Sequence, residues 1–568
     1  MLLLTNYPYS RQEIIDALHG KHGNRQIRFR YDLLDKNDNK IKELDSVIDG
    51  EVSMASLSSI KRTAKFRLKD KGDINWLTDR IQPFVELKMP EIKRKHDNYA
   101  LEFDGVDDKV DVPHSDELNI SKNLEINATV TVYNTSNNWG RIVHKGNDTV
   151  LGNNNFCYNI RYDRSGGFRF SINVNSEWNS IACPLELNKK YKLKMTYDGN
   201  VFKAFVDGVE VGSLNVPGTI QEDMSNLQIG SVYDGLIDEV EILNNGVKVG
   251  HWKFNEGKGS IAKDSTPNGN DGIIHGAKWK KNGIEVETIP SSWIEFPLGI
   301  FLLSSPTRKD ENNFVYREVE AYDGLLILRD DKFDTRYTVT AGTNYRQAVI
   351  DILASAGITK HNIEQTDKVL PVDMEFAPGT EKLEAINTLL RAINYTPLHV
   401  DVYGYFTSMT YRSPSIRAAE YTYKDDELSI IYAGMEEELD LFNVANRWVV
   451  VCSNAEQSLM STYTNSNPDS PTSTVNRGRT IVDYREVTDI ADQQSLDAYV
   501  QRIAFEASQV YGKLTFETAL NPLHDYADVL QIEYSPLGIS GKYSETSWTM
   551  PLKAGARMKH EVRKVVNI

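Results

Sequence analysis

One stretch decides the fold: Leu101-Glu-Phe-Asp-Gly-Val-Asp-Asp-Lys-Val-Asp-Val-Pro113. Apolar and polar residues alternate on each side of a turn rich in glycine and aspartate, and this pattern predicts two short strands. Similar segments, such as Tyr191-Lys-Leu-Lys-Met-Thr-Tyr-Asp198 and Val201-Phe-Lys-Ala-Phe-Val-Asp-Gly208, continue to about residue 290. Residues 91–290 contain no convincing helical pattern. They are therefore predicted to form a separate unit built from strands.

Strand-like sequence lies on both sides of this unit. Ile81-Gln-Pro-Phe-Val-Glu-Leu-Lys-Met-Pro90 precedes it, and Trp293-Ile-Glu-Phe-Pro-Leu-Gly-Ile-Phe-Leu-Leu303 follows it. A loop between two such strands tolerates a domain insertion when the termini of the inserted domain lie close together. We therefore expect residues 91–290 to be inserted into a framework formed by residues 1–90 and 291–568.

Further motifs in the inserted unit carry a family pattern. They are Arg141-Ile-Val-His-Lys145, Leu227-Gln-Ile-Gly230, Gly235-Leu-Ile-Asp-Glu-Val-Glu-Ile242, His251-Trp-Lys-Phe-Asn-Glu-Gly257 and Asp264-Ser-Thr-Pro-Asn-Gly-Asn-Asp-Gly272. With the opening stretch, they closely resemble the laminin-G-like, concanavalin-A-like jelly-roll family. In many relatives the Trp-x-Phe-x-Glu-Gly segment precedes the Phe-Asp-Gly segment, whereas here it follows. A jelly roll accommodates this order if its first and last strands are neighbours in one sheet, which also brings the termini together.

This resemblance implies a binding domain, often for sugars or cell-surface partners, and frequently a bound calcium ion. Calcium takes about six to eight oxygen ligands from carboxylates, carbonyls and water. The aspartates in the matching acidic motifs are the candidate ligands: Asp104, Asp107, Asp238, Asp264 and Asp271. The alternative is that these residues only form turns, because aspartate and glycine are common in turns for reasons of their own.

Three aromatic residues are candidates for stacking on a sugar ring: Trp139, Trp178 and Tyr162. Packing in the core of the sandwich is at least as good an explanation for large aromatic side chains. Both interpretations stay open at the level of the sequence.

The flanking regions also follow a family pattern, carried by the order of many short motifs. These include Arg80-Ile-Gln-Pro-Phe-Val-Glu-Leu87, Ala341-Gly-Thr-Asn-Tyr345, Leu389-Leu-Arg-Ala-Ile-Asn-Tyr-Thr-Pro397, Phe442-Asn-Val-Ala-Asn-Arg-Trp448, Thr518-Ala-Leu-Asn-Pro-Leu-His524 and Lys542-Tyr-Ser-Glu-Thr-Ser-Trp548. They resemble the baseplate-hub or tail-tip hub proteins of phages that infect Gram-positive bacteria. Such hubs are trimers in which each subunit offers two barrel-like domains, so that a ring of six barrels sits on the sixfold tail tube.

The expected fold is mainly β with some α: a framework of two β-barrel-like domains plus α/β parts, interrupted by a jelly-roll β-sandwich. The expected segments are a first barrel (1–90 and 291–335), an α/β part (336–411), a second barrel (412–490 and 512–568) and a helix (491–511). Apolar stripes predict helices at residues 345–356, 381–395 and 496–510, the last with Ser495 as N-cap. Residues 454–479 are rich in Ser, Thr, Asn and Pro, which predicts a long loop.

The resemblance implies a virion protein at the tail tip, assembled in the host cytoplasm. Its implied partners are two further copies of itself, the distal tail protein, the tail tube proteins, the tape measure protein and host cell-wall polysaccharide. The net charge of −16 argues against non-specific nucleic-acid binding, which needs a basic surface. The first six residues lack the basic region of a signal peptide, and no apolar run approaches the ~20 residues of a membrane span.

The sequence contains three cysteines, too few for a disulfide framework. Cys157 and Cys183 fall in the inserted unit, where pairing is possible, while Cys452 stands apart. Free thiols are favoured because intracellular assembly keeps thiols reduced.

No catalytic motif is present, and the chain is expected not to be an enzyme. Both the His-Glu-x-x-His and the Gly-x-Ser-x-Gly patterns are absent. His524 and His560 are isolated in the sequence and are expected to have structural hydrogen-bonding roles. The paired carboxylates of a glycosidase have no fixed spacing, so a secreted cell-wall glycoside hydrolase with an accessory carbohydrate-binding domain is the alternative. A surface adhesin without a viral context is a third hypothesis.

Overall fold

The computed structural model describes residues 2, 7–21, 23–136, 139–147, 155–163, 165–311, 314–426, 431–439, 444–453, 458–509 and 512–568. These residues are mainly β with some α, which confirms the predicted fold class. Most of the N-terminal segment used to argue against a signal peptide lies outside the described residues. The chain divides into two compact units, Met1–Glu91 with Pro290–Ile568 and Ile92–Ile289. We call them the framework and the insert.

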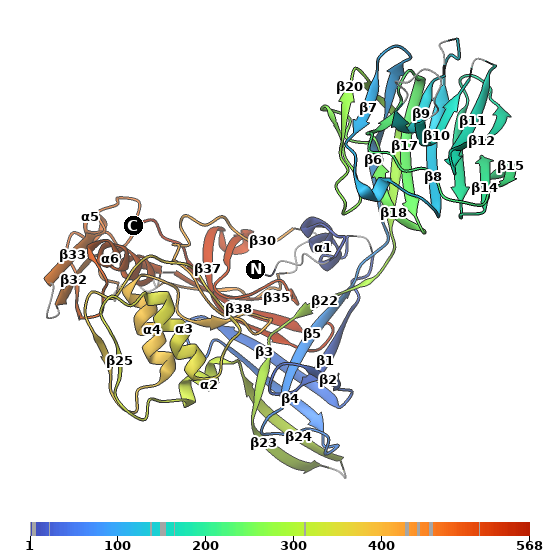
Figure 1. Ribbon diagram of the computed structural model, residues 1–568. Coiled ribbons are helices and arrows are strands. Elements are labelled where there is room, and N and C mark those ends of the chain that lie inside the picture. Colours follow the sequence, from blue (N-terminus) through green and yellow to red (C-terminus); the bar gives the residue numbers. More distant parts are fainter. Residues whose placement is uncertain are drawn as a thin grey trace. The chain divides into compact units, whose positions relative to one another are not determined.

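A sheet of 14 strands forms the centre of the framework (Figure 1). Its first section contains β1 (Ile27–Leu34), β2 (Lys40–Glu43), β3 (Val47–Ala55), β4 (Arg62–Lys69), β5 (Arg80–Lys88), β22 (Trp293–Pro297), β23 (Phe301–Glu311) and β24 (Phe314–Tyr322). Its second section contains β30 (Tyr421–Lys424), β31 (Glu436–Leu439), β35 (Gly512–Ala519), β36 (Val529–Tyr534), β37 (Ile539–Pro551) and β38 (Arg557–Lys564). Strands β3 and β37 pair and join the two sections.

Each section has its own aromatic core because apolar side chains alternate along the strands. In the first section the ring of Phe66 lies edge-on against Tyr31 and Phe301, at centroid distances of 6.3 and 6.2 Å. In the second section Tyr423 and Phe516 form part of the buried cluster. Aromatic pairs of this geometry add to the free energy of burial.

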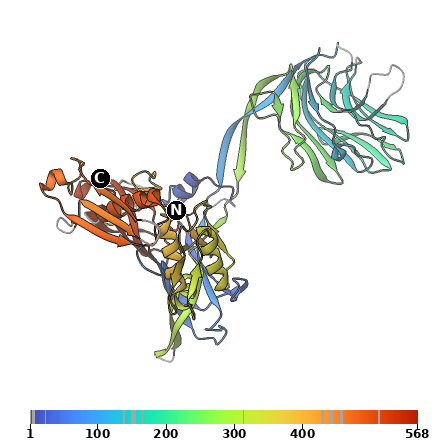
Figure 2. The same ribbon diagram turned by 60° about the vertical axis from the view of Figure 1, so that its left-hand side comes forward.

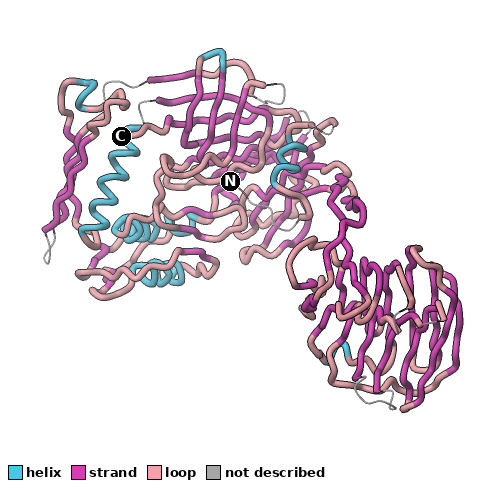
Figure 3. The backbone as a smooth tube through the Cα atoms, turned by 90° about the horizontal axis from the view of Figure 1, so that it is seen from above, coloured by secondary structure: helices cyan, strands magenta, loops and turns pink. Residues whose placement is uncertain are grey.

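Residues 447–487 do not belong to the second section of the sheet, although the sequence predicted residues 412–490 to be part of one barrel. Strands β32 (Arg447–Ser453), β33 (Ser458–Thr464) and β34 (Val482–Val487) form a separate three-stranded sheet. Helix α6 (Gln493–Ser508) packs against this sheet (Figure 3) through Leu496, Val500 and Ala504. The prediction of one barrel over residues 412–490 was therefore wrong. Helix α6 packs against the three-stranded sheet, and the two form a separate hydrophobic core.

The middle of the framework is an α/β part. Helices α3 (Tyr345–Ser355) and α4 (Lys382–Ala392) pack together and share a core with the short α2 (Leu325–Asp330). Short strands complete this part: β25 (Tyr337–Val339), β26 (His361–Ile363), β27 (Met374–Phe376), β28 (His399–Val400) and β29 (Phe406–Ser408). Two further helices are α1 (Arg11–Leu18) and α5 (Thr474–Arg477), and a 3-10 turn spans Ser535–Leu537.

The three predicted helices are confirmed, with differences at their ends. Helix α3 ends one residue before the predicted 356, and α4 ends at Ala392 because Asn394 adopts a left-handed conformation (φ 56°). Helix α6 starts earlier than predicted. Its N-cap is Asp492, whose side chain accepts a hydrogen bond from the Ser495 backbone N–H, so the expected N-cap role of Ser495 was wrong.

The prediction of one long loop at residues 454–479 was also wrong in part. Residues 454–457 lie outside the described residues, but residues 458–464 form β33 and residues 474–477 form α5. The burial pattern of β33 explains the error, because its side chains alternate only between exposed and half-buried positions. A strand of this kind contains too few apolar residues to stand out in the sequence.

The insert is a sandwich of two eight-stranded sheets. One sheet has the order β12 (Glu177–Pro184), β11 (Gly167–Val174), β10 (Asn155–Tyr162), β9 (Arg141–Asn147), β16 (Leu227–Ile229), β7 (Lys109–Val112), β20 (Gly272–His275) and β19 (Ile261–Ala262). The other has the order β15 (Val209–Asn215), β14 (Val201–Val206), β13 (Lys190–Tyr197), β8 (Leu124–Val132), β17 (Asp234–Asn244), β6 (Ile92–Asp104) and β21 (Lys278–Ile289), with β18 (Val247–Trp252) beside β17.

Alternating side chains build the core between the two sheets. Strand β8 has buried residues at every second position, from Leu124 to Val132. Strands with this period of two bury one face and expose the other. The described residues contain one helical element in the insert, the 3-10 turn Asp116–Leu118.

The first and last strands of the insert are neighbours. Strands β6 and β21 run antiparallel side by side (Figure 2), and Ile92 pairs with Ile289. In the framework, β5 pairs with β22, and the Met89 backbone N–H donates to the Ser292 carbonyl at 2.8 Å. The chain thus leaves and re-enters the framework at two adjacent strands, the arrangement that the motif order required.

The three cysteines are free in the structure. Cys157 and Cys452 are buried, and burial raises the pKa of the Cys157 thiol to about 12. Among the described residues, no helix is long and apolar enough to cross a membrane.

Candidate functional site

Two of the three aromatic candidates meet around an arginine of the insert. The guanidinium of Arg161, on β10, lies 4.3 Å from the ring centroid of Trp139 and 5.3 Å from that of Trp178, on β12. Phe156 adds a fourth member, with its ring 3.6 Å from that of Trp178. Trp139 is 41% exposed, so the group reaches the surface of the insert.

Tyr162 belongs to the core and is not available for stacking on a ligand. It is fully buried because Tyr162 lies one position beyond Arg161 on β10 and therefore points to the opposite face of the strand. Its ring lies so close to Gly140 that a Cβ there would come within 2.2 Å of it. Tyr162 also donates its backbone N–H to the Gly140 carbonyl at 2.9 Å. The tyrosine thus fixes the turn that presents Trp139, which has a left-handed φ of 55°.

A row of polar residues crosses the same face of the sheet as Arg161. In the strand register, Asn159 lies opposite His144 on β9 and opposite Ser171 on β11. The row continues to Gln228 on β16 and to Ser180 on β12. Asn159, His144 and Ser171 are buried although they do not face the apolar core. The sequence analysis missed this row because the residues come from five separate strands and carry no motif.

Asp264 and Asp271 organise a turn. The two carboxylate oxygens of Asp264 accept hydrogen bonds from the backbone N–H groups of His251, Thr266 and Asn270 and from the Thr266 hydroxyl. Asp271 accepts the Asp264 N–H and pairs with Lys263 at 2.6 Å. These contacts occupy both carboxylates, which supports the turn interpretation for this pair.

The remaining calcium candidates do not form one group. Asp238 accepts from Asn98 and pairs with Lys190. Asp104 and Asp107 lie close together, with Asp108 as a third carboxylate within 4.8 Å. Burial raises the pKa of Asp108, and the two neighbouring aspartates add to the effect. Three carboxylates are suitable oxygen ligands but fewer than the about six to eight that calcium takes, so calcium binding stays a prediction.

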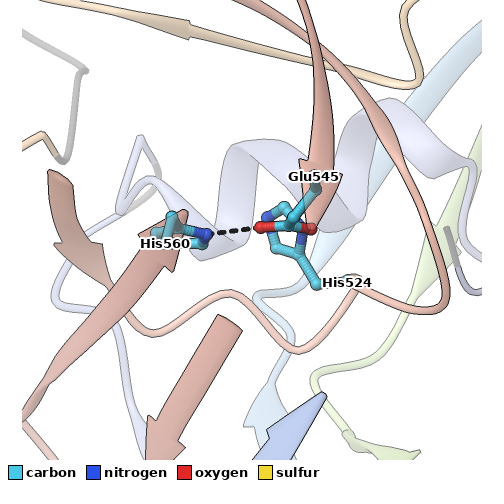
Figure 4. A group of neighbouring side chains, drawn as sticks. All are labelled: His524, Glu545 and His560. Atoms are coloured by element: carbon cyan, nitrogen blue, oxygen red, sulfur yellow. Dashed lines mark hydrogen bonds and ion pairs between the residues drawn. The ribbon is translucent and has the colours of Figure 1, made fainter. Parts of the chain in front are cut away.

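The two histidines that are isolated in the sequence meet in the framework (Figure 4). His524 Nδ1 and His560 Nδ1 each lie 2.7 Å from an oxygen of Glu545, and all three residues are buried. The other ring nitrogens are also occupied, His524 Nε2 by the Tyr423 hydroxyl at 2.7 Å and His560 Nε2 by the Thr518 hydroxyl at 2.8 Å. With every ring nitrogen engaged, the arrangement is that of a structural network rather than a metal centre.

The network holds a charged pair inside the protein. Burial alone would lower the pKa of His524, but Glu545 and Asp528 raise it to about 9. Burial would raise the pKa of Glu545, but His524 and His560 lower it to about 2. Burial lowers the pKa of His560. His524 and Glu545 are therefore charged near neutral pH, while His560 is neutral.

A cavity of about 1080 Å³ lies in the framework, lined among others by His399, Tyr411, Arg502 and Tyr526. Its polar side chains contact one another: the Tyr526 ring stacks on His399 at 4.1 Å, and Arg502 lies over Tyr411 at 4.3 Å. Arg502 also donates to the Tyr395 carbonyl at 2.8 Å. These contacts supply no arrangement of nucleophile and base, and the expectation that the chain is not an enzyme stays a prediction.

The comparisons with known proteins found one matching family model and several similar solved structures. Residues 104–248 match the model of the concanavalin A-like lectin/glucanases superfamily, and no curated protein matches the chain. A tail protein from Neisseria meningitidis is similar in structure at 12% identity, with 50% of this chain and 83% of that chain covered and a TM-score of 0.38. The prophage tail protein gp18 from Listeria monocytogenes is similar at 14% identity, with coverages of 47% and 76% and a TM-score of 0.33.

A carbohydrate-binding module is also among the similar structures. It comes from a Ruminococcus gnavus sialidase and was solved with α2,3-sialyllactose bound. The identity is 13%, the coverage is 27% of this chain and 92% of that chain, and the TM-score is 0.21. At these identities and TM-scores, the likenesses do not assign a role to this chain.

Proposed function

We propose that this chain is a structural protein of a bacteriophage tail tip, where three copies form a hub that closes the tail tube. The insert attaches the particle to carbohydrate on the host cell surface. The distal tail protein, the tail tube proteins and the tape measure protein are the proposed neighbours of the framework.

The observation that carries this proposal is the way the insert joins the framework. The chain leaves at β5 and returns at the neighbouring β22, so the framework sheet is continuous across the junction. A unit spliced in this manner adds a binding surface without interrupting the sheet that makes assembly contacts. Two further observations support assembly by the framework and binding by the insert. Hub-like motifs occur in order on both sides of the junction, and residues 104–248 match the concanavalin A-like lectin/glucanases superfamily.

The chain is expected to form a stable homotrimer. Light scattering of the purified protein should give three times the chain mass of 64.4 kDa, independent of concentration across the range used. A chain that lacks the insert should give a trimer as well, because the framework makes the assembly contacts. A stable monomer, dimer or hexamer would contradict the hub.

A further inference from the structure

The polar row on the outer face of the insert contains hydrogen-bonding groups without partners. Asn159 and Ser171 are 1% and 0% exposed, yet Asn159 Oδ1 and Ser171 Oγ have no hydrogen-bond partner. The two residues are direct neighbours across β10 and β11. Both side chains lie on the face opposite the apolar core. On β10, Tyr158 and Ile160 flank Asn159 in the sequence and point into the core instead.

Unpaired buried groups of this kind are unfavourable. Each one costs about 1–3 kcal/mol relative to a paired group, and buried polar side chains in folded proteins are almost always paired. The two groups lie beneath the surface of this face, and the aromatic cluster with Arg161 and Trp139 supplies its accessible side chains.

The face is also positively charged. The charged groups that act on Arg161 are Arg169, Arg141 and Asp163, and Asp163 already pairs with Arg169. Among the described residues, Arg161 has no ion pair, and its Nε is buried without a hydrogen-bond partner. Burial lowers its pKa to about 10, so the guanidinium still carries its charge at neutral pH.

We propose that this face, with Trp139 and Arg161 as its accessible side chains, binds an anionic polysaccharide. The inference rests on the proposed attachment function and names both its site and the chemical class of its ligand. A sugar ring stacks on the exposed face of Trp139, and the carboxylate or phosphate of the polymer pairs with Arg161. The fork of the guanidinium suits either anion, since both accept two parallel hydrogen bonds.

The two tryptophans have different tasks in this site. Trp178 packs against Phe156 and holds the guanidinium of Arg161 from one side, so it positions the arginine. Trp139 is the more exposed of the two and offers its surface to the ligand. Stacking on the aromatic rings keeps the guanidinium plane in place while leaving its edge free for an anion.

The test compares binding of the full chain to immobilised polymers that differ only in charge. Polygalacturonate and its neutral carboxyl-reduced form probe the carboxylate, while phosphomannan and neutral mannan probe the phosphate. The wild type is expected to bind at least one of the two anionic polymers and neither neutral one. Arg161→Gln and Trp139→Ala should each weaken this binding about tenfold, since a hydrogen bond to a charged group is lost in the first case. Lys203→Gln, a loss of charge on β14 in the opposite sheet, should leave it unchanged.

Each outcome decides between the two proposals. Circular dichroism and melting curves identify a variant that fails to fold, and Trp139→Ala then carries the test because its side chain is exposed. If the wild type binds an anionic polymer and both variants bind equally well, the site is wrong and the attachment function stands. Equal binding to charged and neutral polymers overturns the anionic specificity. If the wild type binds none of the four polymers, the anionic site is wrong, and binding of the same protein to purified cell walls decides whether the attachment function stands.

Discussion

Replacing Glu545 with alanine is expected to destabilise the framework by about 3–5 kcal/mol, the range found when one partner of a buried ion pair is removed. The carboxylate of Glu545 bridges His524 and His560, and the variant leaves the charged His524 in the interior with one fewer counter-charge. The network also connects β37 with β38 and with the loop that carries His524. The measurement is the free energy of unfolding in urea at pH 7.

The matched control is Glu437→Ala, an exposed glutamate on β31 of the same sheet. Its effect should stay within about 0.5 kcal/mol, as for most surface substitutions. Glu545→Gln keeps the volume and part of the hydrogen bonding, so it should fall between the two. Equal stability of the Glu545→Ala and Glu437→Ala variants would contradict the structural role of the network.

The pH dependence of this difference follows from the directions in which the pKa values of His524, Glu545 and His560 are shifted. The raised pKa of His524 contributes stability below about pH 6.5, and this part is lost as the pH rises through 9. The lowered pKa of Glu545 contributes stability above about pH 4.5, and this part is lost as the pH falls toward 2. The lowered pKa of His560 adds a loss of stability below about pH 6.5. The gap between wild type and Glu545→Ala should therefore be largest between about pH 4.5 and 6.5, where both contributions are fully present, and smaller on either side.

Replacing Trp252 with alanine is expected to destabilise the insert by about 3–5 kcal/mol and to leave the framework unchanged. Trp252 is fully buried in the core of the insert, and its indole N–H donates to the Asn270 carbonyl at 2.9 Å. Its ring lies against Gly250, where a Cβ would come within 2.5 Å of the indole. Calorimetry of the full chain should show the transition of the insert at a lower temperature.

Trp139→Ala is the matched control for this substitution, because it removes the same side chain from an exposed position of the same unit. It should change the stability of the insert by less than about 1 kcal/mol. A Trp252→Ala variant in which both units lose stability equally would show that insert and framework unfold together, against the division into two units.

The sequence predicted the parts of the fold that depend on local periodicity. Helix α3 was predicted to within one residue, since Asn344 caps its start and Gly357 follows its end in a left-handed conformation. The start of α6 was misplaced because Asp492 and Ser495 are both good N-cap residues, and the choice between them depends on the direction of the preceding chain. Strand β33 was missed because it buries too little apolar surface to show an alternating pattern.

Sites formed by residues that are distant in the sequence could largely not be predicted from the sequence. Trp139 and Trp178 were identified by residue type, but Arg161 between them was not, since only the pairing of β10 with β11 and of β11 with β12 brings it there. Whether an aromatic residue faces the core or the surface depends on strand register, so the sequence left both interpretations of Tyr162 open, and the structure places it in the core. His524, Glu545 and His560 likewise meet only because β37 and β38 pair.

The aspartates show that a match to a family motif does not by itself identify a metal ligand. Asp264 and Asp271 match acidic family motifs, yet the structure uses both for hydrogen bonds within a turn. Asp108 completes the group with Asp104 and Asp107, and its position in the opening stretch was the available signal. Side chains in turns and side chains that bind calcium are drawn from the same residue types, so composition alone does not separate them.

The central claim, that the insert attaches the particle to host carbohydrate and the framework does not, requires a chain without the insert. Replacing residues 90–291 with Asn-Gly should give one, because Met89 and Ser292 are hydrogen-bonded partners on adjacent strands and Asn-Gly favours the two-residue turn between such strands. The framework should remain folded and trimeric, since the shorter loop costs no additional entropy to close.

The most direct measurement is the binding of three proteins to purified cell walls: the full chain, the chain without the insert and the isolated segment 92–289. The account predicts that the full chain and the isolated segment bind, with the full chain tighter by ~10²–10⁴ if three inserts engage at once. The chain without the insert should not bind. Binding by the framework together with no binding by the isolated segment would contradict the account.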